Sequence, residues 1–311
     1  MPIHKLAMTR REFLAGTAAA AAGLVLPRWA LGAEEKRGAD PHRFALLSDT
    51  HVPSDPARVE RGVNMAEHFR LACEQVAKLQ PRPAGAILNG DCAHLKGLKT
   101  DYQQLAAPAG RLTDAGIPMH VVLGNHDHRG NFYGVLKAHR PAKPLVARRH
   151  VSVVESPRAN WFLLDSLEVT NAVPGLLGSQ QLHWLSAALD ARRDKPAIVM
   201  AHHDPQFPPK QPTGRKRRIS GLKDTRALFD VLGRRRHVKA YIYGHKHCWE
   251  RSVRDGLHLV GLPAVAYVFR KTEISAWVLA TLRDDALRLE LRPLLAKHKG
   301  RAETVDLAWR S

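Results

Sequence analysis

The sequence predicts an α/β protein, because short apolar runs that resemble buried strands alternate with segments of helical spacing. The expected strands are 43–48, 84–89, 117–122, 161–165, 197–201 and 239–243. The expected helices are 57–79, 102–112, 179–193 and 222–232. Beyond residue 250, the runs 257–261, 274–282 and 287–291 follow one another without helices, which predicts a second, more antiparallel sheet.

Start and stop signals support the individual elements. Strand 43–48 is a short apolar run that ends in Asp49-Thr50-His51, and helix 57–79 ends before Pro81. Ser179 is expected to cap helix 179–193, whose leucines line one face. No composition break or repeat divides the chain, so we expect one domain over 43–300 with a C-terminal tail at 301–311.

The net charge is the unusual feature of the composition. The 311 residues are 44% hydrophobic, an ordinary globular value, but 48 Lys and Arg face 29 Asp and Glu, for a net charge of +19. Such a surface attracts anions, and nucleic acid, anionic lipid and phosphorylated small molecules all qualify. The three cysteines are an odd number, so no disulfide framework is implied.

The first 33 residues are typical of an export signal. Thr9–Leu14 contains a twin-arginine pair, a weakly apolar run follows over 15–26, and small residues at 30–33 suit a signal peptidase. The run is too short to span a bilayer comfortably. We therefore expect a twin-arginine signal at 1–33, a flexible leader at 34–42, and a periplasmic or extracellular mature protein.

Metal-ligating side chains follow five of the expected strands. They are Asp49 and His51; Asp91; Asn125, His126 and Asp127; His202; and His245 and His247. Ligands bind at the carboxyl edge of such sheets, and this set is too large for one divalent ion but suits two ions bridged by a carboxylate. Gly124 is expected to provide a sharp turn through its backbone freedom. On an extended chain, residues two apart would point the same way, as in His245 and His247.

These blocks resemble the calcineurin-like metallophosphoesterase superfamily. The matching blocks are Asp49-x-His51, Gly90-Asp91, Gly124-Asn125-His126-Asp127, His202 and Gly244-His245-x-His247, and the resemblance covers Arg43 to Glu250. It implies a four-layer α/β/β/α sandwich of two mixed β-sheets flanked by helices, and a two-metal phosphoesterase.

The resemblance also implies a role for each residue. One metal would be held by Asp49, His51 and His247, the other by Asn125, His202 and His245, with Asp91 as the bridge. A metal-bridging hydroxide would attack phosphorus, His126 would assist the departing oxygen without being a ligand, and Asp127 would orient His126. The ligands accept Fe, Mn, Zn or Co, so the metals stay undetermined.

The residue at position 94, three residues after Asp91, helps to choose between subfamilies, and here it is His94. Purple acid phosphatases have a metal-ligating Tyr at this position, so that subgroup is disfavoured. The bacterial phosphodiesterases of cyclic nucleotides and glycerophosphodiesters usually have an acidic residue there, yet Leu164-Asp165-Ser166 and the helix from Gln180 to Leu185 resemble that branch. A phosphodiesterase is favoured; a phosphomonoesterase, or a non-catalytic protein that binds nucleic acid or another anionic surface, is the alternative.

The remaining expectations concern residues near the ligands. His94 and His203 are candidate substrate contacts, although a structural role is favoured for His203. Cys92 and Cys248 are expected to be buried packing residues. The run Arg215–Arg218 either grips an anionic substrate or is a solvated loop. The expected partners are a phosphorylated small molecule and the twin-arginine export machinery, with no stable nucleic-acid or membrane partner.

Overall fold

The computed structural model describes residues 38–207 and 218–310, and the chain from Gly38 onward forms one compact unit. The twin-arginine segment and residues 215–217 of the basic run lie outside the described residues. Within the described part, no helix has the length and apolar character needed to cross a membrane.

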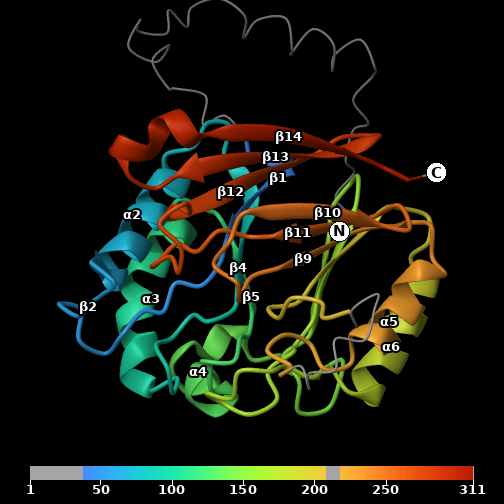
Figure 1. The fold of residues 1–311 in the computed structure, drawn as a ribbon, viewed down its shortest axis with the longest axis horizontal. Coiled ribbons are helices and arrows are strands. Elements are labelled where there is room, and N and C mark those ends of the chain that lie inside the picture. The colour runs from blue at the N-terminus through green and yellow to red at the C-terminus, as the bar shows by residue number, and fades with distance from the viewer. Residues whose placement is uncertain (1–37, 208–217, 311) are drawn as a thin grey trace, which may run out of the picture. The chain divides into compact units, whose positions relative to one another are not determined.

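Two six-stranded mixed sheets form the centre of the fold (Figure 1). The first has the order β14-β13-β12-β1-β4-β5, built from Glu303–Ala308, Ala286–Pro293, Ala276–Leu282, Asp40–Leu47, Pro83–Asn89 and Met119–Val122. The second has the order β10-β11-β9-β8-β7-β6, built from Glu250–Arg254, Leu257–Gly261, Val238–Tyr243, Ala197–Met200, Asn160–Leu163 and Ser152–Glu155. In each sheet, parallel strands are joined to antiparallel ones, as β1 is to β4 and to β12.

Helices cover the outer faces of both sheets, which completes the predicted four layers (Figure 1). On one side, α2 (Met65–Ala77) and α3 (Lys99–Asp114) pack on the first sheet. On the other, α5 (Ser179–Asp190) and α6 (Thr225–Gly233) pack on the second. Between the sheets lies a separate apolar core in which Trp161 contacts Phe44 with ring centres 5.1 Å apart. The fold class is therefore confirmed.

The segment before α2 differs from the prediction. Residues 57–64 are not helical: β2 (Val59–Glu60) and β3 (Val63–Asn64) form a small hairpin. Its two turn residues, Arg61 and Gly62, have φ of 50° and 78°, which a helix does not tolerate. Asn64 then caps α2 by accepting a hydrogen bond from the Glu67 amide at 2.9 Å.

The ends of the domain also differ. Residues expected to be a C-terminal tail form β14, which pairs with β13 along its length. The strand lacks a strong apolar pattern because it lies at the sheet edge, where Glu303 and Asp306 form ion pairs with Arg251 and Arg288. At the other end, β1 begins at Asp40, inside the expected leader.

Four further details escaped the sequence patterns or contradict them. Strands β6 and β10 and the short helix α4 (Arg129–Val135) were not expected. Ser179 is the first residue of α5 and does not cap it; the cap position is Gly178, whose amide donates to the Asp224 carboxylate at 2.8 Å.

Candidate metal centre

The predicted ligands leave the strand ends in tight, left-handed turns. Five of them are non-glycine residues with positive φ: Asp49 (52°), His51 (44°), Asp91 (48°), His245 (67°) and His247 (50°). Such residues rarely adopt this backbone region, and when they do they cluster at functional sites. The expectation that alternate residues share a face on an extended chain was therefore wrong, because the turns, not strand alternation, aim these side chains.

The first group of predicted ligands is Asp49, His51 and His247, and all three residues are buried. The Nε2 atoms of His51 and His247 lie 3.0 Å apart, and His247 Nε2 lies 3.3 Å from Asp49 Oδ1. Their ligand atoms all lie within 4.8 Å of one another, as one metal site requires.

The second group of predicted ligands is Asp91, His202 and His245, whose ligand atoms also lie within 4.8 Å of one another. Asp91 Oδ2 lies 3.2 Å from His202 Nε2 and 3.8 Å from His51 Nε2, which belongs to the first group. Asp91 is thus the residue between the two groups.

Buried polar atoms without partners mark the inside of the centre. Among the described residues, the Asn125 amide oxygen is buried and makes no hydrogen bond, and His202 Nε2 has no partner other than the Asp91 carboxylate at 3.2 Å. A buried polar atom without a partner is costly, so such atoms call for an explanation. Amide oxygen, imidazole nitrogen and carboxylate are ordinary ligands of divalent metals, so the residues present fit a metal ion.

Backbone carbonyls fix the orientation of the ligand imidazoles. The three contacts are His202 Nδ1 to Asn89 O at 2.9 Å, His247 Nδ1 to Tyr267 O at 2.6 Å, and His245 Nε2 to Ser220 O at 2.9 Å. A carbonyl only accepts, so each of these nitrogens carries the proton and the other nitrogen of the ring is left to bind metal.

Burial and mutual charge shift the pKa values of the ligands. Burial opposes the charged form of His202, but the carboxylates of Asp91 and Asp49 outweigh it and raise the pKa to about 10. Burial also opposes ionisation of Asp49, yet His247 and His202 lower its pKa to about 2. For His51, burial dominates and lowers the pKa to about 3. The buried carboxylates of Asp49 and Asp91 therefore need positive charge beside them. A metal ion would supply that charge, and it would compete with the proton on His202.

His126 lies at the edge of this centre. Its Nδ1 donates to the Leu95 carbonyl at 2.9 Å, and its Nε2 lies 4.0 Å from Asp91 Oδ2. One fifth of its side chain is exposed. Its ligand atom also forms a possible third group with those of His51 and Asp91.

Asp127 does not contact the His126 ring as expected. Its buried carboxylate accepts from the amides of Cys92, Ala93 and Gly124 at 3.2, 3.2 and 2.8 Å. It also accepts from the Tyr102 hydroxyl at 3.0 Å. Asp127 therefore joins two ligand-bearing turns, while the Leu95 carbonyl takes the orienting role expected of Asp127.

Gly124 is needed for space and not for backbone freedom. It is not among the residues with positive φ. A Cβ at this position would collide with the carboxylate and the amide of Asp91. The expectation of an unusual turn was thus wrong, and the close approach of two ligand turns is the reason for the glycine.

The two candidate substrate contacts are both buried. His94 Nε2 lies 3.3 Å from the Glu60 carboxylate in the β2–β3 hairpin. His203 is fully buried: Nδ1 lies 2.7 Å from Ser166 Oγ, and its ring centre is 4.7 Å from that of His245. Neither is brought to an open surface. The three cysteines are buried and free, which agrees with packing roles.

Sequence reasoning missed the aromatic residues that contact the centre. Tyr267 stacks on His51 with ring centres 5.1 Å apart, and Phe269 lies 4.3 Å from the His247 ring. The Arg61 guanidinium lies over Phe269 at 5.0 Å. No sequence motif marks these residues, and the expected helix 57–79 hid the turn at Arg61.

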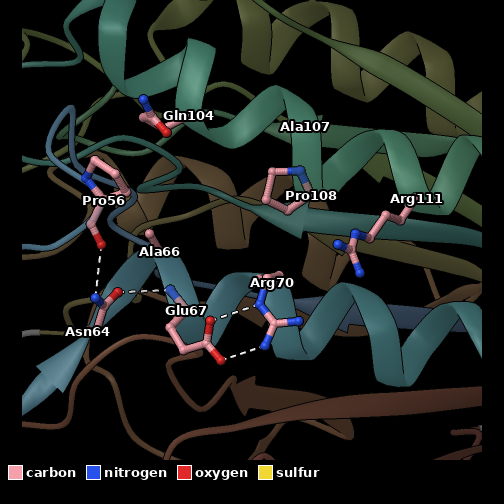
Figure 2. A pocket seen from close by; sticks show the side chains of 9 residues that line it. All are labelled: Pro56, Asn64, Ala66, Glu67, Arg70, Gln104, Ala107, Pro108 and Arg111. Atoms are coloured by element: carbon pink, nitrogen blue, oxygen red, sulfur yellow. Dashed lines mark hydrogen bonds and ion pairs between the residues drawn. The ribbon is translucent and has the colours of Figure 1, made fainter.

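A separate pocket of about 350 Å³ opens between α2 and α3 (Figure 2). Its charged groups satisfy one another, since Arg70 pairs with Glu67 and with Glu74, and Arg111 also pairs with Glu74. None of the predicted metal ligands lines it. It is not part of the metal centre.

The fold and the ligand groups together define a metallophosphoesterase. Residues 42–249 match the family model for calcineurin-like phosphoesterases, so the chain belongs to that family.

Two relatives are similar over most of the chain. It is 26% identical over 231 residues to a 3',5'-cyclic-nucleotide phosphodiesterase of Nostoc sp., covering 74% of this chain and 80% of the relative. It is 28% identical over 226 residues to the 3',5'-cyclic adenosine monophosphate phosphodiesterase CpdA of Pseudomonas aeruginosa, covering 72% and 76%. A dimetal phosphatase from Danio rerio has a similar fold, with a TM-score of 0.65 at 17% identity over 87% of this chain and all of that one.

Proposed function

We propose that the chain is an exported phosphodiesterase that works with two metal ions. Asp49, His51 and His247 would hold one ion, and Asn125, His202 and His245 the other. The observation that carries the proposal is the position of Asp91, whose Oδ2 lies 3.2 Å from His202 and 3.8 Å from His51, one residue from each group. A carboxylate so placed suits a bridge between two ions.

Two ions held there would supply positive charge for the phosphate oxygens and a more acidic water as the nucleophile. The chain itself supplies the rest. Because Nδ1 of His126 donates to the Leu95 carbonyl, the doubly protonated ring would hand its Nε2 proton to the departing ester oxygen and return to the neutral form with its proton on Nδ1. Asp127 and Tyr102 hold the turn that presents His126.

A diester is favoured over a monoester as the substrate. The two relatives named above are phosphodiesterases and match about three quarters of the chain. The phosphodiesterase branch that the chain resembles usually has an acidic residue where this chain has His94. Here the Glu60 carboxylate, 3.3 Å from His94 Nε2, supplies an acidic group next to that position.

Comparing esters and metals tests the proposal. The mature protein is stripped with a chelator and reloaded separately with Mn, Fe, Co or Zn. Hydrolysis of bis(p-nitrophenyl) phosphate, p-nitrophenyl phosphate, a cyclic nucleotide and a glycerophosphodiester is then followed. We expect metal-dependent hydrolysis that is faster for diesters. Faster monoester hydrolysis would make the chain a phosphomonoesterase, and no hydrolysis with any metal would refute the enzymatic function.

Export is proposed from the sequence alone. The Arg10-Arg11 pair, the apolar run after it and the small residues at 30–33 support a twin-arginine signal, and hence a periplasmic or extracellular location.

A further inference from the structure

Large apolar side chains are exposed around the metal centre. Nine described residues have an exposed large hydrophobic side chain, and seven of them lie within two residues of a contact to the centre, to its 126–128 turn or to His94, or make such a contact themselves. We call these seven the apolar rim: Val59, Leu95, Leu98, Val169, Val173, Ile219 and Phe269. The other two, Leu145 and Val253, belong to other parts of the chain. Single exposed apolar residues are normal, but their concentration at one site is not.

Two members of the rim contact residues of the centre directly, and two others adjoin a residue that does so or that packs on the 126–128 backbone. The carbonyl of Leu95 accepts from His126 Nδ1 at 2.9 Å, and Phe269 lies 4.3 Å from the His247 ring. Ile219 adjoins Ser220, whose carbonyl accepts from His245. Leu98 follows Gly97, where a Cβ would collide with the 126–128 backbone.

The other three members of the rim lie one or two residues from a residue that contacts His94 or Asn125. Val59 adjoins Glu60, which reaches His94. Val169 and Val173 flank Asn171, whose amide donates to the Asn125 carbonyl at 2.6 Å. The rim therefore comes from five segments, distant in the sequence, that reach the centre or His94.

Exposed cations stand next to five of the rim residues in the chain: Arg58 beside Val59, Lys96 beside Leu95, Lys99 beside Leu98, Arg218 beside Ile219, and Arg270 beside Phe269. Among the described residues, only Arg58 of these five cations has a carboxylate partner within 4.0 Å. The other four charges are free to meet an anionic partner.

Apolar side chains interleaved with unpaired cations match the surface of an anionic membrane. The apolar groups enter the boundary between headgroups and acyl chains, and the cations meet the lipid phosphates. A rim of this kind would bring the metal centre to phosphoesters displayed at that surface.

We infer that the apolar rim is an interfacial binding surface for an anionic phospholipid bilayer. The inference goes beyond the proposed function, since it concerns where the centre is presented and not which bond is cut. It also departs from the expectation of no membrane partner, because exposure of these side chains is not visible in the sequence.

Vesicle sedimentation tests the inference on the mature protein. Vesicles of phosphatidylcholine with phosphatidylglycerol are compared with phosphatidylcholine alone, at low and at high salt. We expect binding to the anionic vesicles that weakens as salt rises. The double variant Leu98→Ser with Ile219→Ser should bind at least about tenfold more weakly. The matched double variant Leu145→Ser with Val253→Ser, which removes equally exposed apolar side chains elsewhere, should stay within about twofold.

Several results would overturn the inference. Absence of binding to anionic vesicles refutes it directly. Equal binding of both double variants to anionic vesicles refutes the apolar contribution, because adsorption by charge alone would explain it. Equally strong binding to DNA that is also unaffected by the Leu98 and Ile219 substitutions would lead to the same conclusion. Circular dichroism and hydrolysis of a soluble diester should be unchanged in both double variants. If the protein hydrolyses the soluble diester but does not bind vesicles, the membrane inference fails and the proposed function stands.

Discussion

Replacing Tyr102 by Phe removes one hydroxyl from the support of the metal centre without changing the packing volume. Tyr102 is fully buried on α3, and its hydroxyl donates to Asp127 at 3.0 Å and accepts from the His128 amide at 2.8 Å. The substitution therefore breaks two hydrogen bonds on the turn that carries Asn125 and His126.

The expected cost follows from those two contacts. A hydrogen bond to a charged group contributes about 1.5–3 kcal/mol, and a buried donor left without a partner costs about 1–3 kcal/mol. The three other donors to Asp127 remain. We therefore expect the free energy of unfolding to fall by about 2–4 kcal/mol, which corresponds to a drop in Tm of roughly 5–15 °C for a domain of this size.

Denaturant unfolding of the variant and of Tyr133→Phe gives the measurement. Tyr133 is the matched control, since its hydroxyl makes one bond, to His150 Nδ1 at 2.8 Å, on the same face of the fold but without a carboxylate partner. Its loss should cost about 1 kcal/mol. If Tyr102→Phe proves no more destabilising than Tyr133→Phe, Asp127 does not hold the turn in the way described.

Three further predictions concern separate parts of the chain. His126→Ala should keep both metals but lose roughly two to four orders of magnitude in turnover, and less for esters with nitrophenolate leaving groups; a lost metal in elemental analysis would make His126 a ligand. Gly124→Ala should lose metal because the new methyl group collides with Asp91, so an unchanged metal content would contradict the packing described. Arg10→Lys with Arg11→Lys should leave the protein in the cytoplasm on fractionation, and its appearance outside would show that the signal was misread.

The sequence was informative wherever the signal is local. Apolar runs identified nearly all the central strands, because a buried parallel strand is apolar on both faces. The polar residues at their ends predicted a shared centre, and six of them cluster in two groups that could each hold a metal: Asp49, His51 and His247, and Asp91, His202 and His245.

What the sequence could not predict depends on contacts between distant segments. The role of Gly124 is set by Asp91, 33 residues earlier in the chain. The partners of Asp127 come from the turn after β4 and from α3, so its side chain never reaches His126. The left-handed turns at the ligands are strained, and no local propensity predicts them.

Metal content of the Asp91→Ala variant is the most direct test of the two-metal centre. Wild type, Asp91→Ala and the exposed control Asp255→Ala are loaded with the same metal, desalted and measured by elemental analysis beside diester hydrolysis. We predict about two ions per chain for wild type and for Asp255→Ala, and loss of both metal and turnover for Asp91→Ala. Two tightly held ions in Asp91→Ala, or no more than one in the saturated wild type, would contradict the bridge.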